Sequence, residues 1–177
     1  MRHARKLVWA PTAVLIGLAC AGLSAKGRAA PGGGCPATSG QRTLDLVNAE
    51  REANGLRPLE PDTLLMRAAR VHADDMARRG VVSHDGGDGS DPSQRVAATG
   101  YPWIWVGENL AAGQSRPEEV VGGWMRSDAH RHNILSPDFT SAGVAHAESS
   151  VGEWGSYWVM VYAASDPAST AVVPCHP

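Results

Sequence analysis

The first half of the chain has apolar residues at helical spacing. Residues 43–55, TLDLVNAEREANG, predict a helix with Thr43 as its cap and Gly55 as its end. Residues 62–80, DTLLMRAARVHADDMARRG, predict a longer helix that ends at Gly80. The apolar face of this second helix is formed by Leu64, Leu65, Ala68, Ala69, His72 and Met76. The spacing therefore predicts two amphipathic helices, each with one face toward a core.

Two shorter helices are predicted in the middle of the chain. Asp91 followed by Pro92 is typical of a helix start, and this helix should run to about Thr99. Ser115 and Glu118 have the spacing of a capping box, in which each residue bonds to the backbone N–H of the other. A further helix should begin there.

Strand signals occupy residues 103–113 and residues 141–165. WIWVGENLAAG is rich in strand-forming residues, and we expect its strand to end at residues 107–109, GEN. The later segment predicts two strands around a polar, glycine-containing turn. In the second of these, Tyr157, Val159 and Val161 alternate with Trp158, Met160 and Tyr162, so both faces are apolar. A strand covered on both faces implies a sheet between two helical layers, which predicts an α+β fold, a three-layer α-β-α sandwich.

The N-terminus has the layout of an export signal. In MRHARKLVWAPTAVLIGLACAGLSA, basic residues precede an apolar run that ends in small residues. We therefore expect a signal peptide at 1–30, a Gly/Pro/Ser-rich linker at 31–41, the domain at 42–166 and a tail at 167–177, with the protein secreted to the extracellular side. An uncleaved apolar run, or lipidation at Cys20, would instead anchor the protein to the cell envelope.

The net charge and the cysteine content limit the kinds of binding partner and indicate a disulfide. Removal of residues 1–30 takes away five of the 16 basic residues and none of the 18 acidic ones, which leaves a net charge of −7. Such a surface disfavours nucleic acid, and it leaves the N-terminus as the only expected membrane contact. Cys35 and Cys175 both remain, and a pair of cysteines in an oxidising compartment predicts a disulfide.

Three short motifs carry the residues that could do chemistry. They are VVSHD with His84, GENL with Glu108, and WMRSDAHRHNIL with His130. His72, His132 and His146 receive no role. The tryptophans at positions 103, 105, 124, 154 and 158 are expected in the core, because aromatic residues in strands and helices usually pack there.

In this order and spacing the motifs resemble the bacterial branch of the CAP superfamily. That superfamily gathers cysteine-rich secretory proteins, insect-venom allergens and plant pathogenesis-related proteins. The resemblance covers about residues 43–164 and includes VNAEREANGLRPLEPDTLLMRAARVHADDMA, SHDGGDGSDPSQRV, VGENLAAG and YWVMVYA. It implies the CAP (SCP) fold, an α-β-α sandwich with a small, mainly antiparallel sheet, in agreement with the layers predicted above.

The resemblance also implies a surface cleft in which His84 faces Glu108. Eukaryotic relatives complete a metal-holding tetrad with a second histidine and a second acid, but this chain has YWVMV and Ser127 at those places. The bacterial form, W-x-x-S-x-x-H-R-x-N-I-L, offers His130 as the second imidazole. Two imidazoles and one carboxylate could hold a zinc-like divalent ion with an open coordination position, although no cofactor is required.

Structural roles are the alternative for the same residues. Glu108 could accept backbone N–H bonds from the loop after it, and His130 could stabilise a helix C-terminus. Asn109, Arg131 and Asn133 are expected to support the site by hydrogen bonding to loops.

Three classes of function are consistent with these observations. The favoured one is an exported binding module without turnover, acting on a small ligand, a lipid, a peptide or a cell-wall component, because no complete catalytic constellation is present. The second is a metal-assisted hydrolase of peptidase type that uses Glu108 as base. The third is a structural envelope protein held by its N-terminus.

Overall fold

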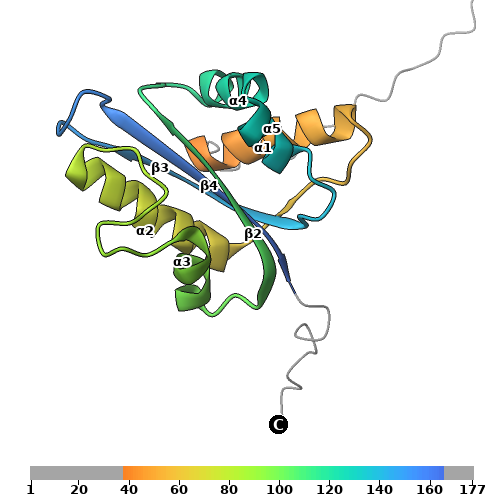
Figure 1. The fold of residues 1–177 in the computed structure, drawn as a ribbon. Coiled ribbons are helices and arrows are strands. Elements are labelled where there is room, and N and C mark those ends of the chain that lie inside the picture. The colour runs from red at the N-terminus through yellow and green to blue at the C-terminus, as the bar shows by residue number, and fades with distance from the viewer. Residues whose placement is uncertain (1–37, 166–177) are drawn as a thin grey trace, which may run out of the picture. The chain divides into compact units, whose positions relative to one another are not determined.

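The computed structural model describes residues 38–165. The predicted signal peptide, Cys20, the Cys35–Cys175 pair, most of the linker and the tail lie outside the described residues. In the described part, one four-stranded sheet in the order β1-β3-β4-β2 lies between two layers of helices (Figure 1). The strands are β1 (Glu60–Pro61), β2 (Trp103–Ala112), β3 (Ser141–Glu148) and β4 (Ser156–Ser165).

The long strand β4 lies inside the sheet. It pairs antiparallel with β3 on one side and with β2 on the other, while the two-residue β1 pairs parallel with β3. The sheet is therefore mainly antiparallel, and both β2 and most of β3 are edge strands.

The two faces of β4 pack on different helices, as the alternation predicted. Tyr157, Val159 and Val161 pack in a core with α2 (Thr63–Arg79) and α3 (Pro92–Thr99). The intervening residues Trp158, Met160 and Tyr162 pack in a second core with α1 (Ser39–Ala53), α4 (Pro117–Arg126) and α5 (Asp128–Ile134). The predicted three-layer sandwich is confirmed.

Local signals placed α2 and α3 correctly. Asp62 caps α2 by accepting the N–H of Leu64 and Leu65, and Gly80 ends it in the left-handed conformation that glycine adopts without strain. Asp91 and Gln94 form a reciprocal capping box at the start of α3.

The start of α1 was predicted wrongly, whereas Gly55 follows its last turn as predicted. The helix begins at Ser39 with Thr38 as its cap, so residues 39–41 belong to the helix and not to the linker. Thr43 lies buried inside α1, where its hydroxyl donates to the carbonyl of Ser39 over 2.8 Å. A threonine hydroxyl can bond either to a cap or to the preceding turn, so the sequence alone did not separate the two.

The predicted end of β2 and the predicted cap of α4 were also wrong. The strand continues through GEN to Ala112, because Glu108 and Asn109 keep their register with β4. Ser115 makes no capping box with Glu118; its N–H donates to Glu119 over 3.3 Å, and Arg116 is the N-cap residue of α4. The segment after Arg126 is the separate helix α5.

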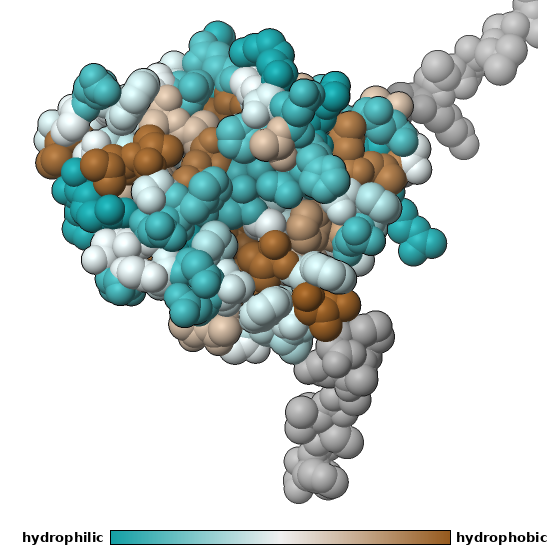
Figure 2. Space-filling model, viewed as in Figure 1, coloured by the Kyte–Doolittle hydropathy of each residue, from teal (hydrophilic) through white to brown (hydrophobic). Residues whose placement is uncertain are grey.

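The surface carries more aromatic residues than predicted. Trp124 and Trp158 are buried, but Trp103, Trp105 and Trp154 are 38%, 62% and 45% exposed. The first two lie at the start of the edge strand β2, where one side of the strand has no neighbour. Figure 2 shows a largely hydrophilic face on which hydrophobic residues form separate patches. Among the helices of residues 38–165, none is long and apolar enough to cross a membrane.

Candidate functional site

The three residues of the GEN motif in β2 have different structural roles. A side chain at Gly107 would collide with the ring of Phe139, with its Cβ 2.8 Å from Cζ, so glycine lets the two segments approach. Glu108 faces the layer of α2 and α3, and Asn109 faces α5 on the opposite side of the sheet.

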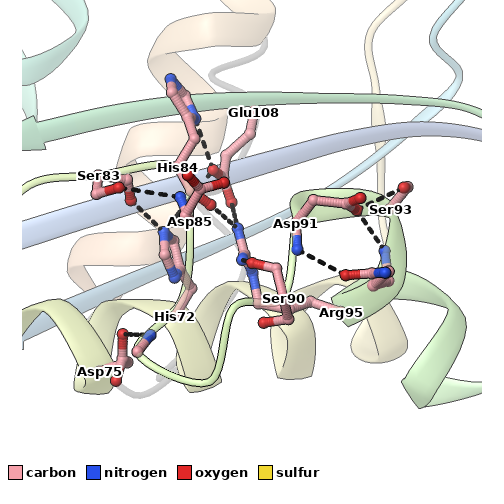
Figure 3. Close-up of polar contacts among 12 residues, drawn as sticks. His72, Asp75, Ser83, His84, Asp85, Ser90, Asp91, Ser93, Arg95 and Glu108 are labelled. Carbon is pink, nitrogen blue, oxygen red and sulfur yellow. Dashed lines mark hydrogen bonds and ion pairs between the residues drawn. The ribbon is translucent and has the colours of Figure 1, made fainter.

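Glu108 is the centre of a buried polar cluster (Figure 3). The residue is only 6% exposed. Its Oε1 accepts from His84 Nδ1 over 2.8 Å, and its Oε2 accepts from Arg95 Nη2 over 2.8 Å. Both carboxylate oxygens are therefore engaged by positively charged or polar side chains from two different segments.

Arg95, on α3, was missed in the sequence. Its side chain is buried, and besides Glu108 it donates to the carbonyl of Ser90 over 2.6 Å and to that of His84 over 2.9 Å. A buried guanidinium needs such partners, because an unpaired charge in the interior is costly. Arg95 thus holds both Glu108 and the backbone of the loop that carries His84.

His84 lies in the loop between α2 and α3, and its side chain is 55% exposed. The hydrogen bond to Glu108 raises the pKa of His84, while partial burial opposes this effect. Since Nδ1 donates to Glu108, the Nε2 atom is left for an external partner. His84 is therefore the member of the cluster that can meet a ligand.

His72, on α2, lies beneath the cluster and was also missed. It is fully buried, its Nε2 donates to the carbonyl of Ser83 over 2.8 Å, and the same atom lies 3.8 Å from Glu108 Oε1. Burial is the largest influence on His72 and lowers its pKa, so the imidazole is held neutral. Its contact with Ser83 fixes the loop next to His84.

His130 comes from α5 and is half-buried. Burial lowers its pKa, and the charge of the neighbouring His84 lowers it further. Its backbone carbonyl accepts from Asn109 Nδ2 over 3.0 Å. The backbone of His130 is thus tied to β2, while its imidazole lies within electrostatic reach of His84.

Of the predicted supporting residues, two form one network. Asn133 donates to Asn109 Oδ1 over 2.9 Å and to the carbonyl of Glu108 over 3.2 Å, so α5 is fixed to the outer edge of β2. Arg131 does not share this role. Its side chain forms an exposed ion pair with Asp128 of the same helix, at 3.1 Å.

The predicted zinc trio does not fit the geometry. Glu108 was expected to be a ligand, but its two oxygens are engaged by His84 and Arg95, and the guanidinium places a positive charge beside the carboxylate. Across residues 38–165, no three His, Cys, Asp or Glu side chains are grouped so that they could hold a metal ion. His84 and His130 alone provide fewer protein ligands than catalytic zinc sites use. No chemical step through a metal follows from this donor set.

His72 and His84 have shifted pKa values and lie at the buried carboxylate of Glu108, and His130, whose pKa is lowered in part by His84, lies near them; such a grouping is typical of a functional site. The sequence offered a weak signal for His72, since a histidine on the apolar face of a helix must find a partner inside. Arg95 gave no signal, because an arginine on a short helix is normally solvated.

Known proteins resemble this chain over the same region. The profile of the cysteine-rich secretory protein family, CAP, matches residues 44–162. The uncharacterized protein YkwD of Bacillus subtilis is 38% identical over 122 residues, which cover 69% of this chain and 46% of YkwD. This chain therefore spans less than half the length of that relative.

Solved structures with the same fold cover the same region of the chain. An extracellular protein containing an SCP domain from Bacillus anthracis has 27% identity and a TM-score of 0.63, over 71% of this chain and 40% of its own. An outer surface protein from Borrelia burgdorferi has a TM-score of 0.64 at 20% identity, over 70% of this chain and 90% of its own, which supports the fold alone. With the GEN strand, the α-β-α layers and the family match covering the same residues, this chain belongs to the CAP family of cysteine-rich secretory proteins.

Proposed function

We propose that this CAP domain is an exported binding module without turnover, and that it recognises a polar ligand of the cell envelope through the surface around His84. The observation that carries this proposal is the state of Glu108. Its side chain is 1% exposed, and both carboxylate oxygens are engaged. A general base must lie within hydrogen-bond reach of the substrate proton, and Glu108 lies behind His84 and Arg95.

The arrangement of the histidines favours ligand binding over catalysis. His84 presents an oriented Nε2 at the surface, and His130 provides a second, neutral imidazole close to it. His72 and Arg95 hold this arrangement from inside, so the site is pre-organised and loses little freedom on binding. Export is supported by the N-terminal sequence and by the extracellular relative from Bacillus anthracis.

A titration of the isotope-labelled, export-processed chain with a soluble peptidoglycan digest tests the proposal. We expect NMR shifts centred on His84 and His130, together with an unchanged digest by mass spectrometry. The variant His84→Ala should lose the shifts. The matched control is His132→Ala on α5, because His132 is exposed and makes no hydrogen bond to the cluster.

Two results would overturn the proposal. Equal shifts in wild type and His84→Ala would place recognition elsewhere. Consumption of digest components by the wild type, abolished in His84→Ala, would show an enzyme and revive the hydrolase alternative.

A further inference from the structure

A surface hollow lies at the other edge of the sheet, away from the His84 cluster. Its volume is about 480 Å³, and it lies where α1, α2 and β3 meet. The residues that line it are Thr38, Ser39, Gly40, Thr63, Met66, Arg67, Arg70, Val144, Ala145 and His146. We call it the Arg67–Arg70 hollow. Its size is within the range of small-molecule sites.

The lining of this hollow is positively charged. It contains two arginines and no acidic residue, in a chain whose acidic residues outnumber its basic ones. Arg70 donates to the carbonyl of His146 over 2.7 Å and lies 3.4 Å from Asp74, which fixes its direction. Arg67 forms no ion pair with any residue in the range 38–165. Its guanidinium is available to an anion.

The outer edge of β3 borders the same hollow with both the N–H and the C=O of Val144. The carbonyls of Ala142 and His146 accept from Asp62 and Arg70, on the outer side of the strand. Because the N–H and C=O of one residue in an antiparallel strand point to the same side, Val144 between them also points outward. β1 pairs only with Ser141 and Ala142, so Val144 is left without a neighbouring strand.

The N-terminus of α1 adds to the positive electrostatic potential of the hollow, but the proposed site does not depend on it alone. Its first turn has no acidic residue, and within the described chain the N–H groups of Ser39 and Gly40 meet no acceptor. Such N–H groups and the helix dipole favour a negative charge. Donors from α1, α2 and β3 thus border the hollow, and an arginine pairs with a phosphate through charge-assisted hydrogen bonds.

A smaller, mostly apolar hollow continues from the charged one. Its volume is about 250 Å³, and it shares Thr38, Gly40, Met66 and Val144 with the Arg67–Arg70 hollow. It adds the apolar Leu44, Pro61 and Ala142 to the lining, together with the polar Gln41, Asp45 and Asn48. Met66 is 44% exposed and lines both hollows, so its side chain is accessible to a ligand at their junction.

We propose that the Arg67–Arg70 hollow binds a phosphate monoester that carries an apolar organic group. The phosphate meets Arg67, Arg70 and the N–H groups of α1 and β3, and the organic group packs on Met66 in the adjoining hollow. This site is separate from the His84 cluster, so the proposal does not depend on the function proposed above.

Calorimetric or NMR titration of the export-processed chain with phenyl phosphate and with inorganic phosphate tests this inference. Phenyl phosphate should bind more tightly than inorganic phosphate, and both affinities should fall as salt rises. Arg67→Gln should weaken both by about tenfold, since a charge-assisted hydrogen bond is lost. Met66→Ser should weaken only phenyl phosphate.

Two control variants distinguish binding in this hollow from a general effect of positive charge and from binding at the His84 cluster. Arg126→Gln removes one exposed positive charge on α4, outside the hollow, and should leave both affinities unchanged. His84→Ala should also bind phenyl phosphate as the wild type does. Arg67 makes no ion pair in the described chain, so its replacement should leave the thermal midpoint unchanged and its binding result interpretable.

A second arm identifies the source of the phosphate monoester. Vesicles of phosphatidylcholine with phosphatidic acid present the same group on a lipid. Binding to these vesicles that Arg67→Gln weakens would assign the site to a lipid headgroup, whereas phenyl phosphate binding alone would assign it to a soluble metabolite. Absence of binding in both arms, or equal binding by wild type and Arg67→Gln, would overturn the proposal.

Discussion

At the scale of single residues, the cluster around Glu108 depends on groups that satisfy one another. Arg95 and His84 occupy the two carboxylate oxygens, and His72 fixes the adjacent loop from below. The resemblance to the CAP superfamily pointed to His84 and Glu108 through the motifs VVSHD and GENL. They could not identify Arg95, whose burial arises only when α3 packs against β2.

Replacement of Glu108 by Gln should destabilise the fold and change His84. The buried guanidinium of Arg95 would lose its counter-ion, and breaking such a pair costs about 3–5 kcal/mol of unfolding free energy. The pKa of His84 should also fall, because its hydrogen bond to a carboxylate is the largest cause of its raised value. Chemical denaturation and NMR titration of His84 measure the two effects.

The control for this substitution is Glu119→Gln. Glu119 pairs with Arg116 at 2.6 Å, but both side chains are exposed, and exposed pairs contribute between 0 and about 1 kcal/mol. If both variants lost the same stability, the Glu108 pair would be no more important than a surface pair.

His72 should make the fold sensitive to acid. Its pKa is lowered by burial, so the folded state holds it neutral while the unfolded state takes up a proton below about pH 6.5. Stability due to His72 is therefore present above that value and is lost as pH falls toward its folded pKa, at up to about 1.4 kcal/mol per pH unit. His84 acts in the opposite direction, because a raised pKa contributes stability at low pH that is lost as pH rises.

Substitution of His72 by Gln separates the two effects. Glutamine can still donate to the Ser83 carbonyl but cannot take up a proton. The unfolding free energy of His72→Gln should therefore fall less between pH 6.5 and pH 5 than that of the wild type. Parallel pH curves for the two proteins would show that His72 does not titrate on unfolding.

At the scale of elements, the sequence predicted helix boundaries correctly where they depend on residues close by in the chain. Asp62 and Gly80 delimit α2, and Asp91 with Gln94 starts α3. The end of β2 was wrong because distant side chains decide it. Asn133 of α5 donates to the carbonyl of Glu108, and Trp124 of α4 donates to that of Leu110 over 2.8 Å, so the outer edge of β2 is covered.

The position of β4 between two helical layers can be tested with Val161. It is 1% exposed and packs in the core with α2 and α3. Val161→Asp would bury an unpaired carboxylate and should cost several kcal/mol, on the order of 3 or more. Asp88→Asn, in the glycine-rich loop, is the control, because asparagine can keep the bond from Ser90 N–H at 2.9 Å. Equal thermal midpoints for Val161→Asp and the wild type would contradict the position of this strand.

At the scale of the whole molecule, the two polar sites lie at opposite edges of one sheet. Helices cover both faces of β4, which leaves the two polar sites to the edge strands β2 and β3. The His84 cluster is built on β2, and the Arg67–Arg70 hollow is built on β3. The two proposed ligand surfaces therefore lie on opposite edges of one sheet and share its core.

The last prediction also concerns the whole chain. Cys35 and Cys175 lie outside the described residues, on either side of the domain, and their disulfide stays a prediction. Closing a loop of this length could add about 4–5 kcal/mol in the loop-entropy model, although measured gains are often smaller. Peptide mapping of exported protein without reductant should recover the two cysteines in one linked fragment. Cys35→Ser and Cys175→Ser should each lower the thermal midpoint to that of the reduced wild type, and two free thiols in the exported protein would refute the disulfide.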